Sequence, residues 1–436
     1  MWLSTRHPTS ESSPDNESQV PTCGDAFALF LFLASRSVEP SETPVTAIPV
    51  QQGKITSSKS IVAGLLLYML APIGMTLIPL IVGAAATDLG LSDSEVGYLA
   101  SIDLMGLAFI SITAMLWIRR YSWHLIARMS LCVVILGNVL SMMSESFAAI
   151  SAARFLTEMG SGGIYALALV TLGETKSPDR SYSFGIASTI ALSVAIFLWF
   201  PSFISEYGID FIFAVHIVLA VLIFPFIGWL PETVAVSEET ADEGSGGSIP
   251  LMLLCFVAFA FFMMAEGGVW AYVERIGAHA GLAADFVGQA LAASQVASFA
   301  AALLASAISV KIGRSAPIVG GMVLFLVSLY FLQLPTANMY LLGVCLSQFA
   351  WIFVLPYLMA MCVQSDPSGK YYVLITAFKM GGFSMGPAAV ATFISGDGAA
   401  TSLVAASWVG AVFLLLSLAI ALPISLRFDK FLHESH

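Results

Sequence analysis

The stretch GLSDSEVGYLAS at residues 90–101 has a counterpart, GLAADFVGQALA, at residues 281–292. A glycine just ahead of a new apolar run is typical of a turn that leads into a helix. The two stretches agree at four pairs of positions, each pair 191 residues apart: Gly90 with Gly281, Leu91 with Leu282, Val96 with Val287, and Gly97 with Gly288. The constant offset indicates that the chain contains one structural unit twice.

The composition requires a membrane. Of the 436 residues, 58% are hydrophobic and 10% are charged, whereas a soluble domain carries roughly 25% charged residues. A soluble fold has no interior large enough to bury that much apolar side chain. The net charge of −11 comes without a basic stripe, which argues against a nucleic-acid partner.

Twelve apolar segments follow one another after the first 58 residues. Each has about the 20 residues that an α-helix needs to cross roughly 30 Å of hydrocarbon. Backbone groups in lipid must be hydrogen-bonded within the protein, which favours helices. The segments are 60–84, 95–117, 126–144, 148–172, 183–204, 210–230, 250–274, 286–309, 315–334, 338–363, 371–394 and 400–425. The sequence therefore predicts an all-α membrane protein with twelve transmembrane helices.

Lysine and arginine gather in the loops on one side of these helices. An excess of these residues marks the cytoplasmic side. One set of loops and ends carries Lys54, Lys59, Arg119, Arg120, Arg128, Lys176, Arg180, Lys311, Arg314, Lys370, Arg427 and Lys430. The opposite loops carry Arg275 alone. We therefore expect both termini in the cytoplasm and the protein in the inner or plasma membrane.

An acidic segment rich in Gly and Ser, residues 231–249, divides the helices into six and six. We expect a six-helix bundle at 59–230, a flexible cytoplasmic linker at 231–249, a second bundle at 250–427 and a short tail at 428–436. Residues 1–58 are rich in Ser, Pro, Thr and Glu, which predicts a disordered N-terminal tail; the alternative is a wrongly assigned start site. Positions 90 and 281 then follow the first helix of each bundle, so one six-helix unit has been duplicated.

Two loops carry related basic motifs. The loop after helix 8 reads VKIGRS and contains Lys311, Gly313 and Arg314. The loop after helix 2 reads IRRYSWH, in which Arg120 corresponds to Lys311 at the same offset of 191 and Ser122 corresponds to Gly313.

Helix 4 contains RFLTEMGSGG, which begins with Arg154, continues with Glu158 and then has Gly160 and Gly162. With the duplicated twelve-helix layout and the loop motifs, the chain resembles the major facilitator superfamily from about residue 60 to residue 427. The resemblance implies two halves that rock about a central site lined by helices 1, 4, 7 and 10, and a gating role for the two loops.

The chain also departs from the family pattern. The first loop has Ser122 where the family has glycine, and it lacks the family's aspartate. Proton-coupled drug exporters of the family carry a Gly-Pro motif on helix 5, which residues 183–204 lack, whereas GFSMGP occurs on helix 11 at 382–387. These departures count against drug:proton exchange.

Five ionisable residues lie deep within the predicted spans: Asp103, Arg154, Glu158, Glu266 and Lys379. A charge at the bilayer centre costs about 2.5–3.5 kcal/mol on insertion scales, so such residues usually face a wet cavity or a partner. We expect the two cations to bind substrate and the three acids to carry protons, because a carboxyl group in a low-dielectric site can hold a proton near neutral pH.

Pairing within the protein is the alternative for each of these charges. Arg154 and Glu158 are four residues apart and share a helix face, and Asp103 could pair with Arg154. Lys379 could pair with an acid on a neighbouring helix, and Glu266 could make an interhelical hydrogen bond. Gly267 and Gly268 are expected to loosen helix 7 next to Glu266.

Three uncharged residues complete the candidate substrate contacts: Trp270, Gln348 and Trp351. Indole rings can stack on a ring-shaped substrate, and the alternative for all three is packing. The five cysteines lack metal-ligand spacing, and the chain contains neither HExxH nor Gly-x-Ser-x-Gly. We therefore expect no metal and no cofactor, and we disfavour a membrane enzyme or a sensor.

The sequence thus predicts a monomeric secondary transporter whose partners are a small-molecule substrate, protons and the lipid bilayer. The favoured function is proton-coupled uptake of a small organic anion, an aromatic or other carboxylate. The alternative is efflux of drugs or metabolites by proton antiport.

Overall fold

The computed structural model describes residues 55–118, 120–232, 249–308, 312–334, 336–366, 372–394 and 399–434. All of them belong to one compact unit that starts at Gln52. Lys311, most of the predicted tail and most of the predicted linker lie outside the described residues.

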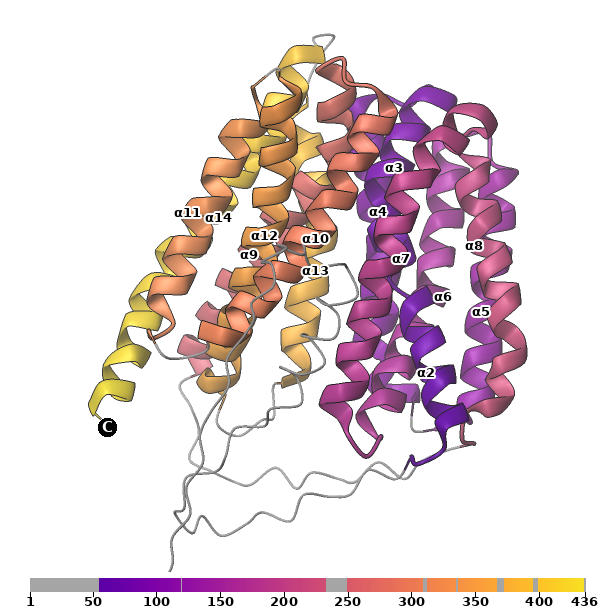
Figure 1. Ribbon diagram of the computed structural model, residues 1–436, viewed down its shortest axis with the longest axis horizontal. Coiled ribbons are helices and arrows are strands. Elements are labelled where there is room, and N and C mark those ends of the chain that lie inside the picture. The colour runs from indigo at the N-terminus through magenta and orange to yellow at the C-terminus, as the bar shows by residue number, and fades with distance from the viewer. Residues whose placement is uncertain are drawn as a thin grey trace, which may run out of the picture. The chain divides into compact units, whose positions relative to one another are not determined.

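The described residues form helices joined by short connections (Figure 1). The first half contains α2 (Ser58–Leu70), α3 (Ile73–Asp88), α4 (Asp93–Trp117), α5 (Trp123–Met142), α6 (Phe147–Gly173), α7 (Pro178–Tyr207) and α8 (Asp210–Ile223), which continues as the 3-10 turn η1 (Phe224–Trp229). The second half contains α9 (Ile249–His279), α10 (Ala284–Ile308), α11 (Ser315–Leu332), α12 (Ala337–Ser365), α13 (Tyr372–Phe393) and α14 (Ala399–Glu434).

The prediction of twelve transmembrane helices is confirmed. Eleven segments of the described chain are long and apolar enough to cross a membrane, with α2 and α3 counted as one crossing that breaks at Ala71 and Pro72. The twelfth crossing is α13, whose 22 mostly apolar residues also include Lys379 and Pro387. Large apolar side chains such as Leu116 and Trp199 are exposed on the outside, where lipid solvates them.

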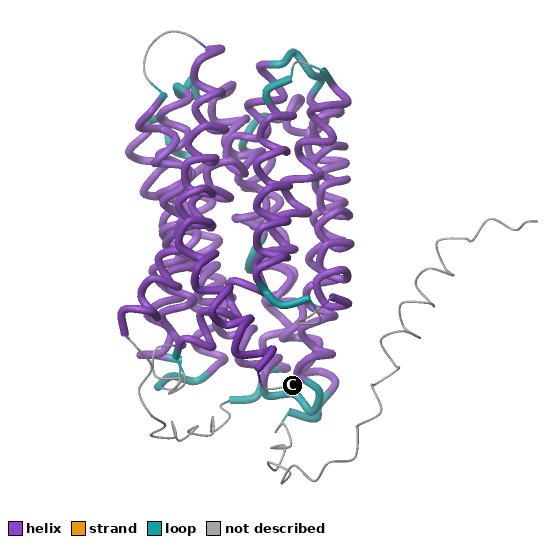
Figure 2. The backbone as a smooth tube through the Cα atoms, turned by 90° about the vertical axis from the view of Figure 1, so that its left-hand side faces the viewer, coloured by secondary structure: helices purple, strands orange, loops and turns teal. Residues whose placement is uncertain are grey.

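The two halves meet along three pairs of helices. α4 packs along α13, α7 packs along α10, and α3 contacts α9. The halves approach each other at the top of Figure 1 and diverge towards the bottom, and Figure 2 shows the helices running between these two ends. We call the top the closed end, which carries the connections at 89–92, 208–209 and 280–283, and we call the bottom the open end.

The duplicated stretch explains how the halves come together at the closed end. Gly90 and Gly281 both have a positive φ, of 64° and 73°, so each turn adopts a conformation that favours glycine. A Cβ atom on Gly97 would lie 1.9 Å from the Tyr272 hydroxyl, and one on Gly288 would lie 2.3 Å from the Phe197 carbonyl oxygen. The second repeated glycine therefore lets α4 and α10 each cross closely against the opposite half.

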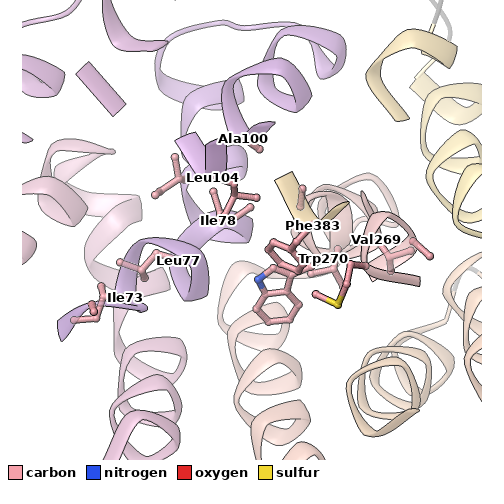
Figure 3. Packing of buried hydrophobic residues seen from close by; sticks show 14 of the residues in the cluster. Ile73, Leu77, Ile78, Ala100, Leu104, Val269, Trp270 and Phe383 are labelled. Atoms are coloured by element: carbon pink, nitrogen blue, oxygen red, sulfur yellow. The ribbon is translucent and has the colours of Figure 1, made fainter. Parts of the chain in front are cut away.

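Apolar side chains continue this contact toward the middle of the molecule. Figure 3 shows Ile78 and Leu104 of the first half facing Trp270 and Phe383 of the second half. All four belong to one buried hydrophobic cluster that runs through both halves. The core is therefore continuous across the boundary between the halves at the closed end.

Replacing Gly288 by Ala is expected to destabilise the protein, because the added methyl group has no room beside the Phe197 carbonyl. Overpacking of this kind costs about 1–3 kcal/mol, so the apparent melting temperature in detergent falls. Gly320→Ala is the matched control, because a Cβ on Gly320 meets nothing within 4 Å. Equal melting temperatures for the two variants would contradict the close crossing.

Candidate functional site

A cavity of about 290 Å³ lies between the two halves. Its polar lining residues come from eight helices, four in each half: Tyr68, Thr76, Tyr165, Thr189, Ser193, Glu266, Gln295, Ser298, Gln348 and Lys379. Most of the remaining wall is apolar or aromatic, including Met75, Trp351 and Phe383. The cavity thus combines a few polar groups with an apolar surface, as small-molecule sites usually do.

Trp270 forms the roof of the cavity toward the closed end. Its indole Nε1 donates to the Met75 carbonyl oxygen at 3.1 Å, which joins α9 to α3. Its ring meets the ring of Phe197 edge-on at 5.9 Å between centroids. Trp270 therefore lines the predicted site, but its only hydrogen-bond donor is already used to hold the halves together.

Glu266 and Gln348 lie next to each other in the cavity wall. Gln348 Nε2 donates to Glu266 Oε1 at 2.6 Å, so the interhelical hydrogen bond that the sequence left as an alternative is present. Glu266 Oε2 has no hydrogen-bond partner among the described residues, although the side chain is buried. One carboxylate oxygen is thus available for a proton or a ligand.

Gly267 and Gly268 were expected to loosen helix 7, which is α9 in the structure, and this expectation is wrong. α9 runs without a break from Ile249 to His279. A Cβ on Gly267 would lie 2.0 Å from the Phe383 carbonyl oxygen, and one on Gly268 would lie 2.9 Å from Val390. The glycines are needed for the close packing of α13 on α9, which brings Phe383 and the rest of α13 up to the cavity.

Lys379 is half-buried in the cavity wall on α13. Tyr372 begins this helix at the open end, so Lys379 lies about two turns inside. In the part of the chain that the structure describes, its ammonium group forms neither an ion pair nor a hydrogen bond. Trp351, which lines the same cavity, also has a buried indole N–H without an acceptor among the described residues. The cavity therefore holds two unused donors, one of them cationic.

Arg154 lies elsewhere, inside the first half, and does not line the cavity. Its guanidinium is 3.1 Å from Asp103 Oδ2 and 3.4 Å from Glu158 Oε1, and its Nη1 donates to Asn138 Oδ1 at 3.2 Å. The two acids and the arginine are at most 1% exposed. Arg154 is therefore paired within the first half, which is the alternative that the sequence left open. The packing of α4, α5 and α6 brings its partners together.

The charges of this buried cluster do not balance. Two carboxyl groups share one guanidinium, and Asp103 Oδ1 and Glu158 Oε2 have no hydrogen-bond partner among the described residues. The carboxyl group of Glu158 packs directly against Gly74 of α3, just beyond the break between α2 and α3. His216 of α8 is also buried in this half, and its Nε2 has no partner in the described chain.

The two halves use corresponding places for their acids. With the offset of 191, Gln348 corresponds to Thr157, next to Glu158, and Glu266 corresponds to Met75, next to Gly74. Each half therefore has one acid between its first and fourth helices. The acid comes from the fourth helix in the first half and from the first helix in the second half.

The predicted gating loops lie at the open end. Arg120 is exposed. Arg314 N and Ser315 N donate to the two carboxylate oxygens of Asp429 at 2.8 and 3.0 Å, which ties the start of α11 to the end of α14. The Arg314 side chain contacts Gln364 at the end of α12. Asp429 was not predicted from the sequence, because a single acid among basic residues after the last crossing has no distinguishing pattern.

A second missed group closes the opposite end. Asp93 at the start of α4 accepts from Arg275 of α9 at 2.8 Å and lies 3.4 Å from His279. The Tyr272 hydroxyl donates to the Asp93 carbonyl oxygen at 2.7 Å. One signal was present in the sequence: Arg275 is the only cation of the predicted outer loops. We call these four residues the closed-end seam.

Arg154→Gln is expected to destabilise the protein and Lys379→Gln is not. Removing one partner of a buried ion pair costs about 3–5 kcal/mol, because the remaining charges lose their compensation. Lys379 has no such partner among the described residues, so its loss leaves no uncompensated acid. Thermal unfolding in detergent distinguishes the two, and equal melting temperatures would contradict the different placement of the two cations.

Asp93→Ala is expected to loosen the closed-end seam. A partly buried ion pair is worth about 1 kcal/mol, which corresponds to roughly a fivefold change in the open population. The readout is the labelling rate of Ile78→Cys, a fully buried position at the boundary of the halves, by a membrane-impermeant maleimide with Cys132 replaced by serine. Glu206→Ala, which removes an exposed acid at the same end, is the control. An unchanged rate in Asp93→Ala would show that the seam does not hold this end closed.

A family model described as Major Facilitator Superfamily matches residues 64–389. No curated protein sequence matches the chain. Among solved structures, a bacterial homologue of the human lysosomal transporter Spinster, in an inward-facing and unoccupied conformation, is similar with a TM-score of 0.66 and 14% identity, and the match covers 86% of this chain and 98% of that one.

Two further solved structures are similar. The POT family transporter PepTSo has a TM-score of 0.68 and 11% identity, with 86% of this chain and 99% of that chain covered. The human organic anion transporter MFSD10 has a TM-score of 0.56 and 16% identity, with 82% and 99% covered. At these identities the similarity shows the fold alone.

Proposed function

The chain belongs to the major facilitator superfamily, and we propose that it takes up a small organic anion together with protons. It is a multi-pass membrane protein with a transporter fold. The observation that carries the proposal is Lys379, a cation in the central cavity without a counter-ion among the described residues. A buried charge without a partner is costly, so an anionic substrate that supplies the partner gains binding energy at that position.

The rest of the cavity favours a small ligand with an apolar body. Its volume of about 290 Å³ lies at the lower end of the range for ligand sites. In this proposal the carboxylate of the substrate binds Lys379 and accepts from the free indole N–H of Trp351. The apolar or aromatic body of the substrate packs on Met75 and Phe383, beneath Trp270.

Glu266 is the proposed proton carrier of the cavity. Its Oε1 accepts from Gln348 and its Oε2 has no partner in the described chain. A proton on Oε2 removes the cost of burying the charge, and it leaves Lys379 free of competition for the substrate carboxylate. The one proton carried on Glu266 balances the charge of a monoanionic substrate.

Asp103 and Glu158 form the proposed second proton site. Two acids share Arg154, so one proton brings the buried cluster to neutrality. Arg154 holds both carboxyl groups and has no substrate contact in this proposal. The cavity is formed entirely within one chain, which supports a monomer as the transporting unit.

Alternating access follows from the two ends of the molecule. The closed-end seam separates for substrate to enter from one side, and the loops with Arg120 and Arg314 approach each other when the open end closes. The excess of Lys and Arg in these loops supports a cytoplasmic position for the open end. The structure thus corresponds to an inward-open state in this proposal.

Efflux of drugs or metabolites by proton antiport is the second candidate. The observation that favours it is the aromatic lining of the cavity by Tyr68, Tyr165, Trp270 and Trp351. Such a lining accepts flat amphipathic molecules of either charge. A cationic dye as substrate would place its charge on Glu266 and would not need Lys379.

The test uses proteoliposomes with a trapped pH-sensitive dye and an inward proton gradient. Aromatic and aliphatic monocarboxylates are added one at a time, and a transported carboxylate is expected to acidify the lumen. Lys379→Gln is expected to abolish this uptake. Glu266→Gln is expected to keep substrate exchange at equal pH but to lose accumulation driven by the proton gradient, and Gly320→Ala serves as the control.

Two outcomes would contradict the proposal. Carboxylate uptake that is unchanged in Lys379→Gln would remove the anion site. Export of a cationic dye that survives Lys379→Gln and is lost in Glu266→Gln would replace uptake by the efflux alternative.

A further inference from the structure

A second cavity, of about 410 Å³, lies on the outside of the first half between α4, α5 and α6. It is separate from the central cavity, with which it shares no lining residue. Three of its lining side chains are about half exposed: Tyr121 at 54%, Leu125 at 47% and Met129 at 58%. In a transmembrane protein such a surface faces the bilayer, so we call this cavity the lipid-facing groove.

Two glycines of α6 shape the floor of the lipid-facing groove. A Cβ on Gly160 would lie 2.7 Å from the Ser130 carbonyl oxygen, so this glycine brings α5 close to α6. Gly163, one turn further along α6, also lines the groove and has no side chain to fill it. The recess is therefore built into the helix packing.

The walls suit a hydrocarbon chain. They consist of Ile110, Leu125, Ile126, Met129, Val133 and Leu156 together with other apolar side chains, and no lining residue is charged. Along α5 the groove extends from Leu125 to Val133, which is about 12 Å at 1.5 Å per residue. That depth accommodates part of one acyl chain lying along the helices.

The mouth of the groove is at the level of the membrane interface. Trp117 at the end of α4 and Tyr121 in the following loop line it, and these residue types gather at the boundary between hydrocarbon and headgroups. Trp117 Nε1 donates to Thr113 of its own helix at 3.4 Å. The aromatic pair therefore fixes the depth of the groove relative to the bilayer surface.

The charge at this mouth is positive. Arg120, next to Tyr121, is exposed and has no ion pair with a described residue. The 20-residue helix α5 begins at Trp123 and adds partial positive charge at the same place. The Trp123 N–H there donates to the Glu232 carbonyl oxygen at 2.9 Å, so the cation available to a phosphate is Arg120. Basic positions between transmembrane helices on the cytoplasmic side recruit anionic headgroups.

We propose that the lipid-facing groove binds an anionic phospholipid of the cytoplasmic leaflet. One acyl chain lies in the groove over Gly160 and Gly163, and the headgroup phosphate binds Arg120. Because Arg120 belongs to a predicted gating loop, the lipid holds this loop against the first half. The binding site does not depend on the identity of the transported substrate.

The experiment measures lipids retained by the full chain. The protein is reconstituted in nanodiscs of equimolar phosphatidylglycerol and phosphatidylcholine, released into mild detergent and analysed by native mass spectrometry. The wild type is expected to retain one phosphatidylglycerol with roughly a tenfold preference over phosphatidylcholine, since one charge-assisted contact is worth about 1.4 kcal/mol.

Two variants test the headgroup contact and the acyl-chain contact separately. Arg120→Gln is expected to retain both lipids equally, because the cation that selects the phosphate is gone. Met129→Trp fills the groove from an exposed position that tolerates a larger side chain, and it is expected to lose the retained lipid without a change in melting temperature. Arg180→Gln is the control, since Arg180 is exposed on the same side but lies over the Phe184 ring.

Three results would overturn the proposal. A loss of preference in Arg180→Gln equal to that in Arg120→Gln would indicate general surface charge. Full lipid retention in Met129→Trp would show that the acyl chain lies elsewhere. A lipid-free dimer that Met129→Trp dissociates would assign the groove to a second copy of the chain.

Discussion

An ionised side chain within a bilayer needs a counter-charge, a hydrogen-bonding partner or water, and this requirement determines how the two halves of the protein differ. The first half satisfies Arg154 internally, with Asp103, Glu158 and Asn138 around it. The second half leaves Lys379 facing the central cavity, and among the described residues it gives Glu266 the amide of Gln348 as its one hydrogen-bond partner. The first half therefore supplies a rigid, charge-dense support, and the second half supplies the groups that remain available to a ligand.

The two halves share features of their backbone but differ in the chemistry of their interiors. The repeated glycines serve the same purpose twice, because each lets one helix cross to the opposite half. In contrast, the acid between the first and fourth helices differs in origin. It is Glu158 of the fourth helix in the first half and Glu266 of the first helix in the second half. The symmetry of the scaffold thus persists at the closed end, where packing is closest, and is lost in the interior, where the charges are.

Patterns of apolar residues were sufficient to predict the fold. Twelve runs of suitable length have few alternatives in a bilayer, and the repeat at positions 90 and 281 indicated that the runs form two similar sets. The site was harder to predict, because Arg154 and Lys379 look alike in sequence: both are cations inside apolar runs. What distinguishes them is the packing of α4 against α6, which brings Asp103 to Arg154 from 51 positions away. Asp93, Arg275 and Asp429 lie at or near helix ends, where charged residues are common. Of the three, Arg275 alone stood out in the sequence, as the one cation of the predicted outer loops.

The first membrane crossing is two helices and not one, since the chain breaks at Ala71 and Pro72. Its second piece, α3, touches the Glu158 carboxyl group through Gly74 and holds the Trp270 indole through the carbonyl of the next residue, Met75. The adjacent residues Gly74 and Met75 of α3 therefore connect the acid cluster of the first half to the roof of the central cavity. In the proposed transport cycle, a proton on Glu158 and a ligand beneath Trp270 would therefore both act on α3.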